Sequence, residues 1–189
     1  MAKKIMLNLG CGNVGLGNES LKGFINVDLE GKKQKDFVKA DVRDLPFPDN
    51  YADYILAREV LEHIPFLNIM NTLVEWVRVL KPGGRMVITS PNFNLMAHDF
   101  LNTKFSFKDF HSMARGFYGS QRSKYDIHLT PINPEFLNYL MQQLPVTGEI
   151  KSFAKGTRPP SYPGYKSQPD HVFRYGVVHV DAKKWEKQF

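Results

Sequence analysis

A short apolar run near the N-terminus ends in a glycine-rich turn, and this stretch constrains the fold most. Residues Met6–Leu9 are bounded by Gly10, which is typical of a short buried strand. Gly10 and Gly12 have no Cβ atom and can adopt positive φ, so a ligand can approach their backbone closely. A strand that ends in such a loop predicts the mouth of an open parallel sheet, where nucleotide-like ligands bind. A turn with spare glycines is the alternative.

Strand-like and helix-like segments alternate along the chain and predict an α/β fold. Pro65 and the Lys81–Gly84 stretch delimit a helix from about residue 66 to 80, whose predicted buried face consists of Met70, Leu73, Val74, Val77 and Leu80. Asn133 and Pro134 begin a second helix. The predicted strands cover residues 24–29, 37–41, 53–57, 86–90, 148–153 and 172–180. We therefore expect a Rossmann-like, mostly parallel sheet with an antiparallel C-terminal edge strand and helices on both faces.

Residues 92–130 interrupt this alternation. The stretch is aromatic and polar, carries His98, His111 and His128, and has weak periodicity. Because a long loop inside a compact domain is usually functional or disordered, and aromatic residues argue against disorder, we expect a lid or substrate-binding insertion. The 189 residues then form a single domain, residues 1–189, with this insertion at about 92–130.

Composition narrows the class of protein and its partners. The chain shows no signal segment and no stretch of transmembrane length, so a cytoplasmic location is expected. The single cysteine, Cys11, excludes an internal disulfide and a cysteine metal cluster, and no metal ligand is assigned. From Lys151 onward, eight lysines and arginines stand against three acidic residues. This basic end suits either a solubilising surface or an acidic partner such as nucleic acid.

The glycine turn also matches the dinucleotide fingerprint G-x-G-x-x-G over Gly10–Gly15, with Asp28 about twenty residues on. That fingerprint requires a full helix directly after the loop to receive a pyrophosphate. Gly15, Gly17 and Asn18 disfavour such a helix, and the next strand follows soon after. A cofactor without phosphates fits better.

Five motifs in order carry a more specific resemblance. They are Leu-Asn-Leu-Gly-Cys-Gly, Asn-Val-Asp-Leu, Ala-Asp-Val-Arg-Asp-Leu-Pro-Phe-Pro-Asp, Glu-His-Ile and Leu-Lys-Pro-Gly-Gly-Arg. Over Ile5 to about Phe93 the chain resembles class I S-adenosylmethionine-dependent methyltransferases, and in particular the type 11 group. The rest of the chain resembles them in having two closing strands.

The resemblance assigns cofactor-binding roles to individual positions. Backbone atoms of Gly10, Cys11, Gly12 and Arg58 would line the methionine part of S-adenosylmethionine. Asp28 would accept hydrogen bonds from the ribose hydroxyls, and Asn8, where many relatives carry an acid, would contact the ammonium group. For the adenine, Leu29 would pack on the ring face, Asp41 would accept from the amino group, and the Val42 backbone N–H would reach a ring nitrogen. Asp28 as a strand-end cap and Asp41 as a turn former are the structural alternatives.

Methyl transfer from a sulfonium needs alignment of the reactants and a base when the nucleophile holds a proton. His63 follows the fourth strand at the rim of the predicted cleft and is one candidate base, with Glu59 and Glu62 as nearby alternatives. A second candidate set is Tyr118, Asp126 and His128 in the insertion, a region that resembles some type 11 members linked to glycan pathways. A packed helix-entry histidine and a loop-fixing Asp-x-His pair are the structural alternatives.

The leading expectation is methylation of a small-molecule or sugar hydroxyl. The Asn/Asp-Pro-Pro-Tyr/Phe motif of many amino methyltransferases does not follow the fourth strand, where Ala57–His63 stands instead. Two rivals remain: a non-catalytic binder that uses the basic end to hold nucleic acid, and an NAD-dependent oxidoreductase.

Overall fold

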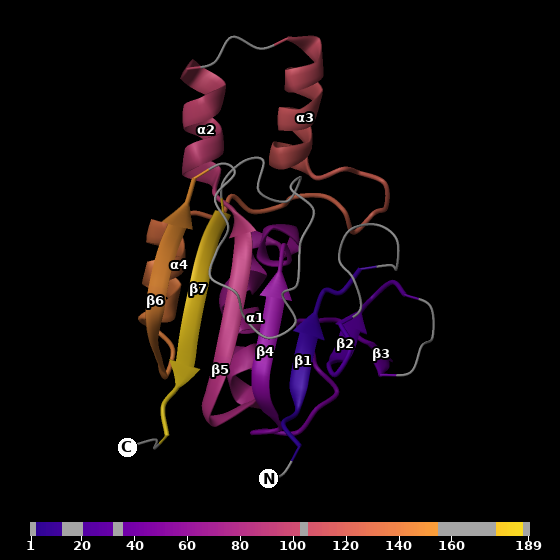
Figure 1. Cartoon of the computed structure of the whole chain (residues 1–189), viewed down its shortest axis with the longest axis vertical. Helices are drawn as coiled ribbons and strands as arrows, with labels where there is room; N and C mark the ends of the chain where they lie inside the picture. The colour runs from indigo at the N-terminus through magenta and orange to yellow at the C-terminus, as the bar shows by residue number, and fades with distance from the viewer. Residues whose placement is uncertain (1–2, 13–20, 32–35, 103–105, 155–176, 187–189) are drawn as a thin grey trace.

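The computed structural model describes residues 3–12, 21–31, 36–102, 106–154 and 177–186. Its seven-stranded sheet has the order β3-β2-β1-β4-β5-β7-β6 (Figure 1). The strands are β1 (Met6–Leu9), β2 (Ile25–Asp28), β3 (Phe37–Lys39), β4 (Ala52–Arg58), β5 (Leu80–Pro91), β6 (Val146–Phe153) and β7 (Val177–Lys184). The helices are α1 (Ile69–Val79), α2 (Phe93–Asn102), α3 (Phe107–Tyr118) and α4 (Pro134–Met141), with two 3-10 turns, η1 (Leu61–His63) and η2 (Phe66–Asn68).

Strands β1 to β5 pair in parallel, whereas β7 is antiparallel to both of its neighbours, β5 and β6. The predicted sheet is therefore confirmed, with the reversed strand lying beside the edge strand rather than at the edge itself. Strand β7 begins at Val177, later than predicted, and the residues between 155 and 176 lie outside the described part of the chain.

The main core lies between the sheet and helices α1 and α4, which both lie behind the sheet in Figure 1. A smaller cluster on the opposite face consists of Phe24, Tyr54, Leu56 and Val87. In the described part of the chain, helices therefore cover one of the two sheet faces on which they were predicted.

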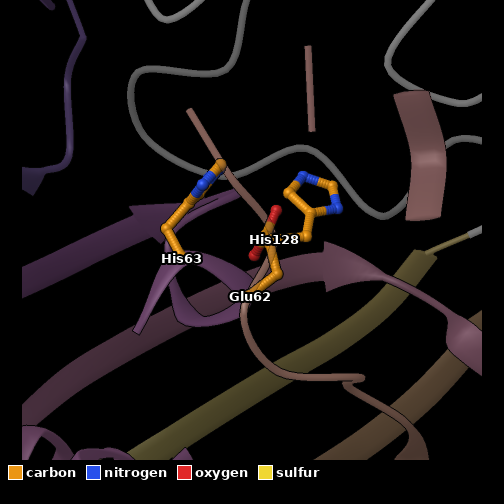
Figure 2. A group of neighbouring side chains, drawn as sticks. All are labelled: Glu62, His63 and His128. Atoms are coloured by element: carbon orange, nitrogen blue, oxygen red, sulfur yellow. The ribbon is translucent and has the colours of Figure 1, made fainter. Parts of the chain in front are cut away.

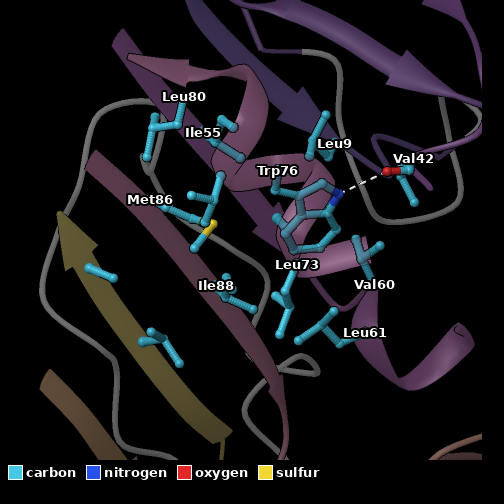
Figure 3. Close-up of a cluster of buried hydrophobic side chains, with 14 of the residues drawn as sticks. Leu9, Val42, Ile55, Val60, Leu61, Leu73, Trp76, Leu80, Met86 and Ile88 are labelled. Atoms are coloured by element: carbon cyan, nitrogen blue, oxygen red, sulfur yellow. Dashed lines mark hydrogen bonds between the residues drawn. The ribbon is translucent and has the colours of Figure 1, made fainter. Parts of the chain in front are cut away.

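Helix α1 buries most of its predicted face, with one exception. Val74, assigned to the core from sequence, is 48% exposed, whereas Trp76 is fully buried. The Trp76 indole donates a hydrogen bond to the Val42 carbonyl at 2.8 Å (Figure 3). Leu73 and Val77 are buried as predicted, and the other buried residues of the helix are Ile69, Thr72, Trp76 and Val79. The spacing of apolar residues in the sequence does not distinguish this buried face from a face that includes Val74.

The second predicted helix forms as expected. Asn133 caps α4 by accepting a hydrogen bond from the Phe136 backbone N–H at 2.8 Å, and Pro134 occupies the first turn. The insertion contains two helices, α2 and α3, which the weak periodicity of this segment did not predict. Figure 1 shows both helices standing beyond the carboxyl ends of the parallel strands.

A buried lysine connects β7 to the end of α1. The Lys184 ammonium donates to Asn50 Oδ1 at 2.9 Å and to the carbonyls of Val77 at 2.9 Å and Leu80 at 2.8 Å. The last carbonyls of a helix have no partner within the helix, so this side chain satisfies two groups that burial would otherwise leave unpaired.

We expect Lys184→Met to lower the free energy of unfolding by about 2 kcal/mol, because it leaves buried carbonyls without a donor. Urea denaturation followed by circular dichroism measures the change. Lys183→Met is the matched control: its half-exposed side chain pairs with Glu186, so the loss should stay within about 0.5 kcal/mol. Equal losses in the two variants would contradict this role of Lys184.

Candidate functional site

A cavity of about 390 Å³ opens at the carboxyl ends of β1, β2 and β4. Gly10 and Gly12 line it with positive φ values of 62° and 68°. A Cβ atom at Gly10 would overlap the Val60 side chain, so glycine is required there for both conformation and space. The sequence-predicted residues that line this cavity are Gly10, Gly12, Asp28, Leu29, Asp41, Val42, His63 and Asp126.

Asp28 lies at the end of β2 and is tied to the glycine loop. One of its carboxylate oxygens accepts from the Gly12 N–H at 2.7 Å, and the other accepts from the Glu30 N–H at 2.8 Å. Burial raises the pKa of Asp28, while these two backbone donors oppose the rise. A carboxylate oxygen can accept more than one hydrogen bond, so Asp28 retains capacity toward a ligand in the cavity.

Asp41 makes a close ion pair with Arg43, whose Nη2 lies 2.6 Å from Oδ2. The hydrogen bonds from Arg43 lower the pKa of Asp41, so this carboxylate is ionised at neutral pH. Arg43 also lines the cavity, although the sequence analysis gave it no role. A ligand that binds at Asp41 would therefore contact a carboxylate that is already paired with Arg43.

Three of the predicted cofactor residues do not line the cavity. Asn8 is buried in the sheet, where its amide donates to Asn26 Oδ1 at 2.8 Å. Cys11 is buried, and burial raises the pKa of its thiol to about 12. The Arg58 side chain is buried at the end of β4. The structure therefore groups the glycine loop with Asp28 and Asp41 but places the Asn8 side chain against its neighbouring strand.

The polypeptide after β4 makes a tight bend that brings acidic groups to the cavity rim. Glu59 has a φ of 52°, and its N–H donates to the Thr89 carbonyl at 2.8 Å. Strained backbone of this kind persists where the surroundings fix it, and such positions cluster at functional sites. Burial, and then the neighbouring Glu62, raise the pKa of the Glu59 carboxyl well above its usual value.

Glu62, His63 and His128 form a cluster although 65 residues separate the two histidines. Leu129 and Thr130 donate their N–H groups to the Glu62 carbonyl at 2.7 and 3.1 Å, and this pins the 119–130 loop to η1. The imidazole rings of His63 and His128 pack edge to face with centroids 4.8 Å apart. Figure 2 shows the Glu62 carboxylate between the two rings in that view.

Both histidines are neutral at pH 7. Burial lowers the pKa of His63, and burial followed by the charge of His63 lowers that of His128 to about 4. Nδ1 of His63 lies 3.1 Å from the Ile127 carbonyl, and Nδ1 of His128 lies 2.7 Å from the Gly116 carbonyl. Because a carbonyl oxygen can only accept, each Nδ1 carries the proton and each Nε2 has a lone pair.

Asp126 and Tyr118, the other two predicted catalytic residues, have mainly structural contacts. Asp126 accepts hydrogen bonds from the Ser120 hydroxyl and backbone N–H, which fixes the loop. The Tyr118 side chain is 62% exposed, and its carbonyl accepts from the His128 N–H at 3.2 Å. The contacts of Asp126 are therefore those of the alternative interpretation, in which the Asp-x-His pair fixes the loop.

A second cavity, of about 570 Å³, lies beneath α2 and α3. Glu62, Tyr118 and His128 line it, and Leu129 lines both cavities. The rest of the wall is largely apolar, with Phe93, Met96, Phe100, Phe110, Met113 and Phe117. The sequence predicts a substrate-binding segment here, but its weak periodicity does not reveal the two helices that carry these residues.

The strand order gives no support to the dinucleotide interpretation. The usual dinucleotide-binding sheet has the order 3-2-1-4-5-6, whereas here the antiparallel β7 lies between β5 and β6. The helix expected to distinguish the two interpretations falls on residues 13–20, which lie outside the described part of the chain. No helix in the described segments is long and apolar enough to cross a membrane.

Comparison with known proteins gives consistent results for sequence and fold. A family described as "Methyltransferase domain" matches residues 7–88. Sterol 24-C-methyltransferase erg6 of Schizosaccharomyces pombe is 38% identical over 87 residues, which are 44% of this chain and 22% of that protein. The ubiquinone/menaquinone biosynthesis C-methyltransferase UbiE of Pseudomonas savastanoi pv. phaseolicola is 33% identical over 84 residues, 43% of this chain and 32% of that protein. The chain therefore spans a third or less of these relatives.

Among solved structures, a SAM-dependent methyltransferase from Archaeoglobus fulgidus superposes with a TM-score of 0.57 and 18% identity, covering 96% of this chain and 86% of that one. At this identity the likeness concerns the fold. Residues 7–88 match the methyltransferase domain family, and the sheet around them has the fold of a SAM-dependent methyltransferase, which confirms the class I, type 11-like resemblance drawn from the sequence motifs.

Proposed function

We propose that this protein transfers a methyl group from S-adenosylmethionine to an apolar small-molecule acceptor. The observation that carries the proposal is the meeting of two different cavities at Glu62, His63 and His128. One cavity is built on glycine backbone and carboxylates, and the other is built on aromatic side chains. Leu129 belongs to both walls, so ligands in the two cavities would be neighbours.

The first cavity fits the cofactor in its chemistry. Gly10 and Gly12 present backbone without Cβ atoms, and Asp28 would accept from the ribose hydroxyls while Gly12 and Glu30 hold it in place. Leu29 and Val42 supply apolar surface for the adenine ring, with Asp41 beside them. When bound, S-adenosylmethionine supplies a methyl group activated by a positively charged sulfur.

The second cavity favours an apolar acceptor over a sugar. A sugar ring needs several hydrogen-bonding partners, because burying an unpaired hydroxyl is costly. The described wall offers mainly phenylalanine and methionine side chains, and its polar side chains are those of Glu62, Tyr118, His128 and Thr130. The names of the two relatives refer to a sterol and to ubiquinone and menaquinone biosynthesis, which are apolar compounds.

Within this arrangement His128 is best placed to manage a proton of the acceptor. Its Nδ1–H is held by the Gly116 carbonyl, so Nε2 can accept the proton that a hydroxyl loses as its oxygen is methylated. Tyr118 and Asp126 remain candidates of lower rank, since Asp126 is engaged with Ser120.

We propose that α2 and α3, within the 92–130 insertion of a single domain, form the cover of the acceptor cavity. A cytoplasmic location stays a prediction.

Calorimetric titration with S-adenosylhomocysteine, with NADH in parallel, tests the cofactor. We expect micromolar binding of the first compound and none of the second; the reverse result would favour the oxidoreductase. Labelled S-adenosylmethionine, offered with phenols, quinols and sterols in one set and sugars in another, then tests the acceptor. Methylation of sugars alone would overturn the apolar assignment.

A non-catalytic binder remains the second candidate function. Much of the basic excess it relies on falls on residues 155–176, which lie outside the described residues. Binding of S-adenosylhomocysteine without any turnover, together with nucleic-acid binding that weakens steeply with salt, would favour it.

We expect His128→Ala to lower turnover by about 10²-fold or more while leaving the affinity for S-adenosylhomocysteine unchanged, since His128 faces the acceptor cavity. His98→Ala is the control, because His98 is an exposed histidine on α2 that lines neither cavity. Full activity of His128→Ala would reduce His128 to a loop-fixing role.

A further inference from the structure

The cluster of Glu62, His63 and His128 has a property that the sequence did not reveal. Each side chain offers one ligand atom, and these three atoms all lie within 4.8 Å of one another. Two of the residues come from η1 and the third from a loop more than sixty residues later (Figure 2). In the sequence, His63 and His128 belong to separate candidate sets, and no metal ligand is assigned from it.

The Nδ1 atoms of the two imidazoles are hydrogen-bonded in the way that is common for metal-ligating histidines. A ligating histidine usually donates its other ring N–H to a carbonyl or carboxylate, which fixes the ring and its tautomer. Here the Ile127 carbonyl receives Nδ1–H of His63, and the Gly116 carbonyl receives that of His128. Each Nε2 is left as the nitrogen that can bind a cation.

The carboxylate has an unused oxygen. Glu62 is 2% exposed, its Oε2 accepts from the Ser90 hydroxyl at 2.8 Å, and its Oε1 has no hydrogen-bond partner. A buried polar atom without a partner costs free energy unless a ligand satisfies it. A cation between Glu62 and the two histidines would do so.

We propose that Glu62, His63 and His128 bind one divalent transition-metal ion, for which zinc is the best match. Two imidazole nitrogens and one carboxylate oxygen are a ligand set of catalytic zinc sites, whereas magnesium and calcium prefer oxygen ligands alone. In a tetrahedral zinc site, ligand atoms about 2.1 Å from the ion lie about 3.4 Å apart. The observed limit of 4.8 Å therefore requires side-chain adjustments of up to about 1.4 Å when the ion binds.

The consequence for chemistry rests on the proposed function. Glu62 and His128 line the acceptor cavity and His63 lines the cofactor cavity, so the ion would lie at their junction. A site with three protein ligands keeps a coordination position open. An acceptor oxygen at that position would have a lowered pKa and would lose its proton to solvent, so with the ion bound His128 would act as a ligand and not as the base.

Metal binding is tested on the full-length, tag-free protein after treatment with a chelator and dialysis. Calorimetric titration with zinc chloride should give one equivalent bound with micromolar or tighter affinity. Cobalt(II), used as a spectroscopic probe of the same site, should give the visible absorption of a low-coordinate complex. No zinc binding above the buffer control would overturn the proposal.

Variants locate the site. His63→Ala and His128→Ala should each weaken zinc binding by about 100-fold or more and abolish the cobalt absorption, whereas His98→Ala should change neither. Ser90→Ala keeps all three ligands but removes the hydrogen bond to Glu62, so it should weaken binding by about 10-fold. Zinc affinity unchanged in both histidine variants would overturn the assignment.

The proposed function is separated from this site by titrating the same metal-free protein with S-adenosylhomocysteine. Binding of S-adenosylhomocysteine without zinc binding overturns the metal site alone. Zinc binding that depends on His63 and His128, without S-adenosylhomocysteine binding, supports the metal site and contradicts the proposed cofactor.

Discussion

Asp28→Ala is expected to weaken S-adenosylhomocysteine binding by about 100-fold, as measured by isothermal titration calorimetry. The variant removes the carboxylate that would accept from two ribose hydroxyls. Hydrogen bonds to a charged group contribute about 1.5 kcal/mol or more each, and 1.4 kcal/mol corresponds to a factor of ten in affinity. It also removes the acceptor of the Gly12 N–H, so the glycine loop loses its attachment to β2.

Two further variants separate these contributions. Asp28→Asn keeps the size and one oxygen of the side chain, and we expect a smaller loss because one backbone N–H retains an acceptor. Asp44→Ala removes an exposed carboxylate that does not line the cavity, so its affinity should equal that of the wild type. An Asp28→Ala affinity within threefold of the wild type would contradict the assignment of Asp28 to the ribose.

The cofactor half of the molecule could be predicted because its signals are local. A short apolar run before Gly10 predicts β1, and Asp28 closes the next apolar run, so both sit at carboxyl ends of adjacent parallel strands. Asn8 shows the limit of this reasoning. Its position in the motif predicts a ligand contact, but its side chain meets Asn26 across the β1–β2 pair, and only the sheet register shows that.

The second cavity, which we propose holds the acceptor, could not be predicted in the same detail, because its geometry depends on contacts between distant segments. The Glu62 carbonyl receives the N–H groups of Leu129 and Thr130, and the Thr130 hydroxyl donates to the Ile64 carbonyl at 2.7 Å. These backbone contacts bring His128 beside His63, and no spacing within either motif encodes them. The sequence therefore named both histidines without showing that they are neighbours.

Trp76→Ala is expected to lower the free energy of unfolding by about 4 kcal/mol. Large-to-small changes of a buried tryptophan leave a cavity, and typical losses are about 3–5 kcal/mol. The Val42 carbonyl also loses its donor. Because a domain of this size is stable by only about 5–15 kcal/mol, the alanine variant is close to the limit of folding. Urea denaturation followed by circular dichroism measures the loss.

Trp76→Phe keeps the protein folded and isolates the hydrogen bond. It retains most of the apolar bulk but has no indole N–H, so we expect a loss of about 2 kcal/mol from the unpaired Val42 carbonyl and imperfect packing. Val74→Ala, on the exposed side of the same helix, should cost less than about 0.5 kcal/mol. The sequence periodicity assigned Val74 to the core, so a Val74→Ala loss larger than that of Trp76→Phe would restore the helix face predicted from sequence.

The Trp76–Val42 contact also links the core to the cofactor cavity. Val42 lines that cavity next to Asp41, and the Trp76 indole donates a hydrogen bond to the Val42 carbonyl (Figure 3). Releasing the carbonyl should let the 41–43 segment move, so Trp76→Phe should weaken S-adenosylhomocysteine binding several-fold even where the protein is fully folded. Val74→Ala, on the exposed side of the helix, should leave the affinity unchanged. A Trp76→Phe variant that is destabilised but binds S-adenosylhomocysteine normally would show that Trp76 supports the fold without positioning the cofactor-binding segment.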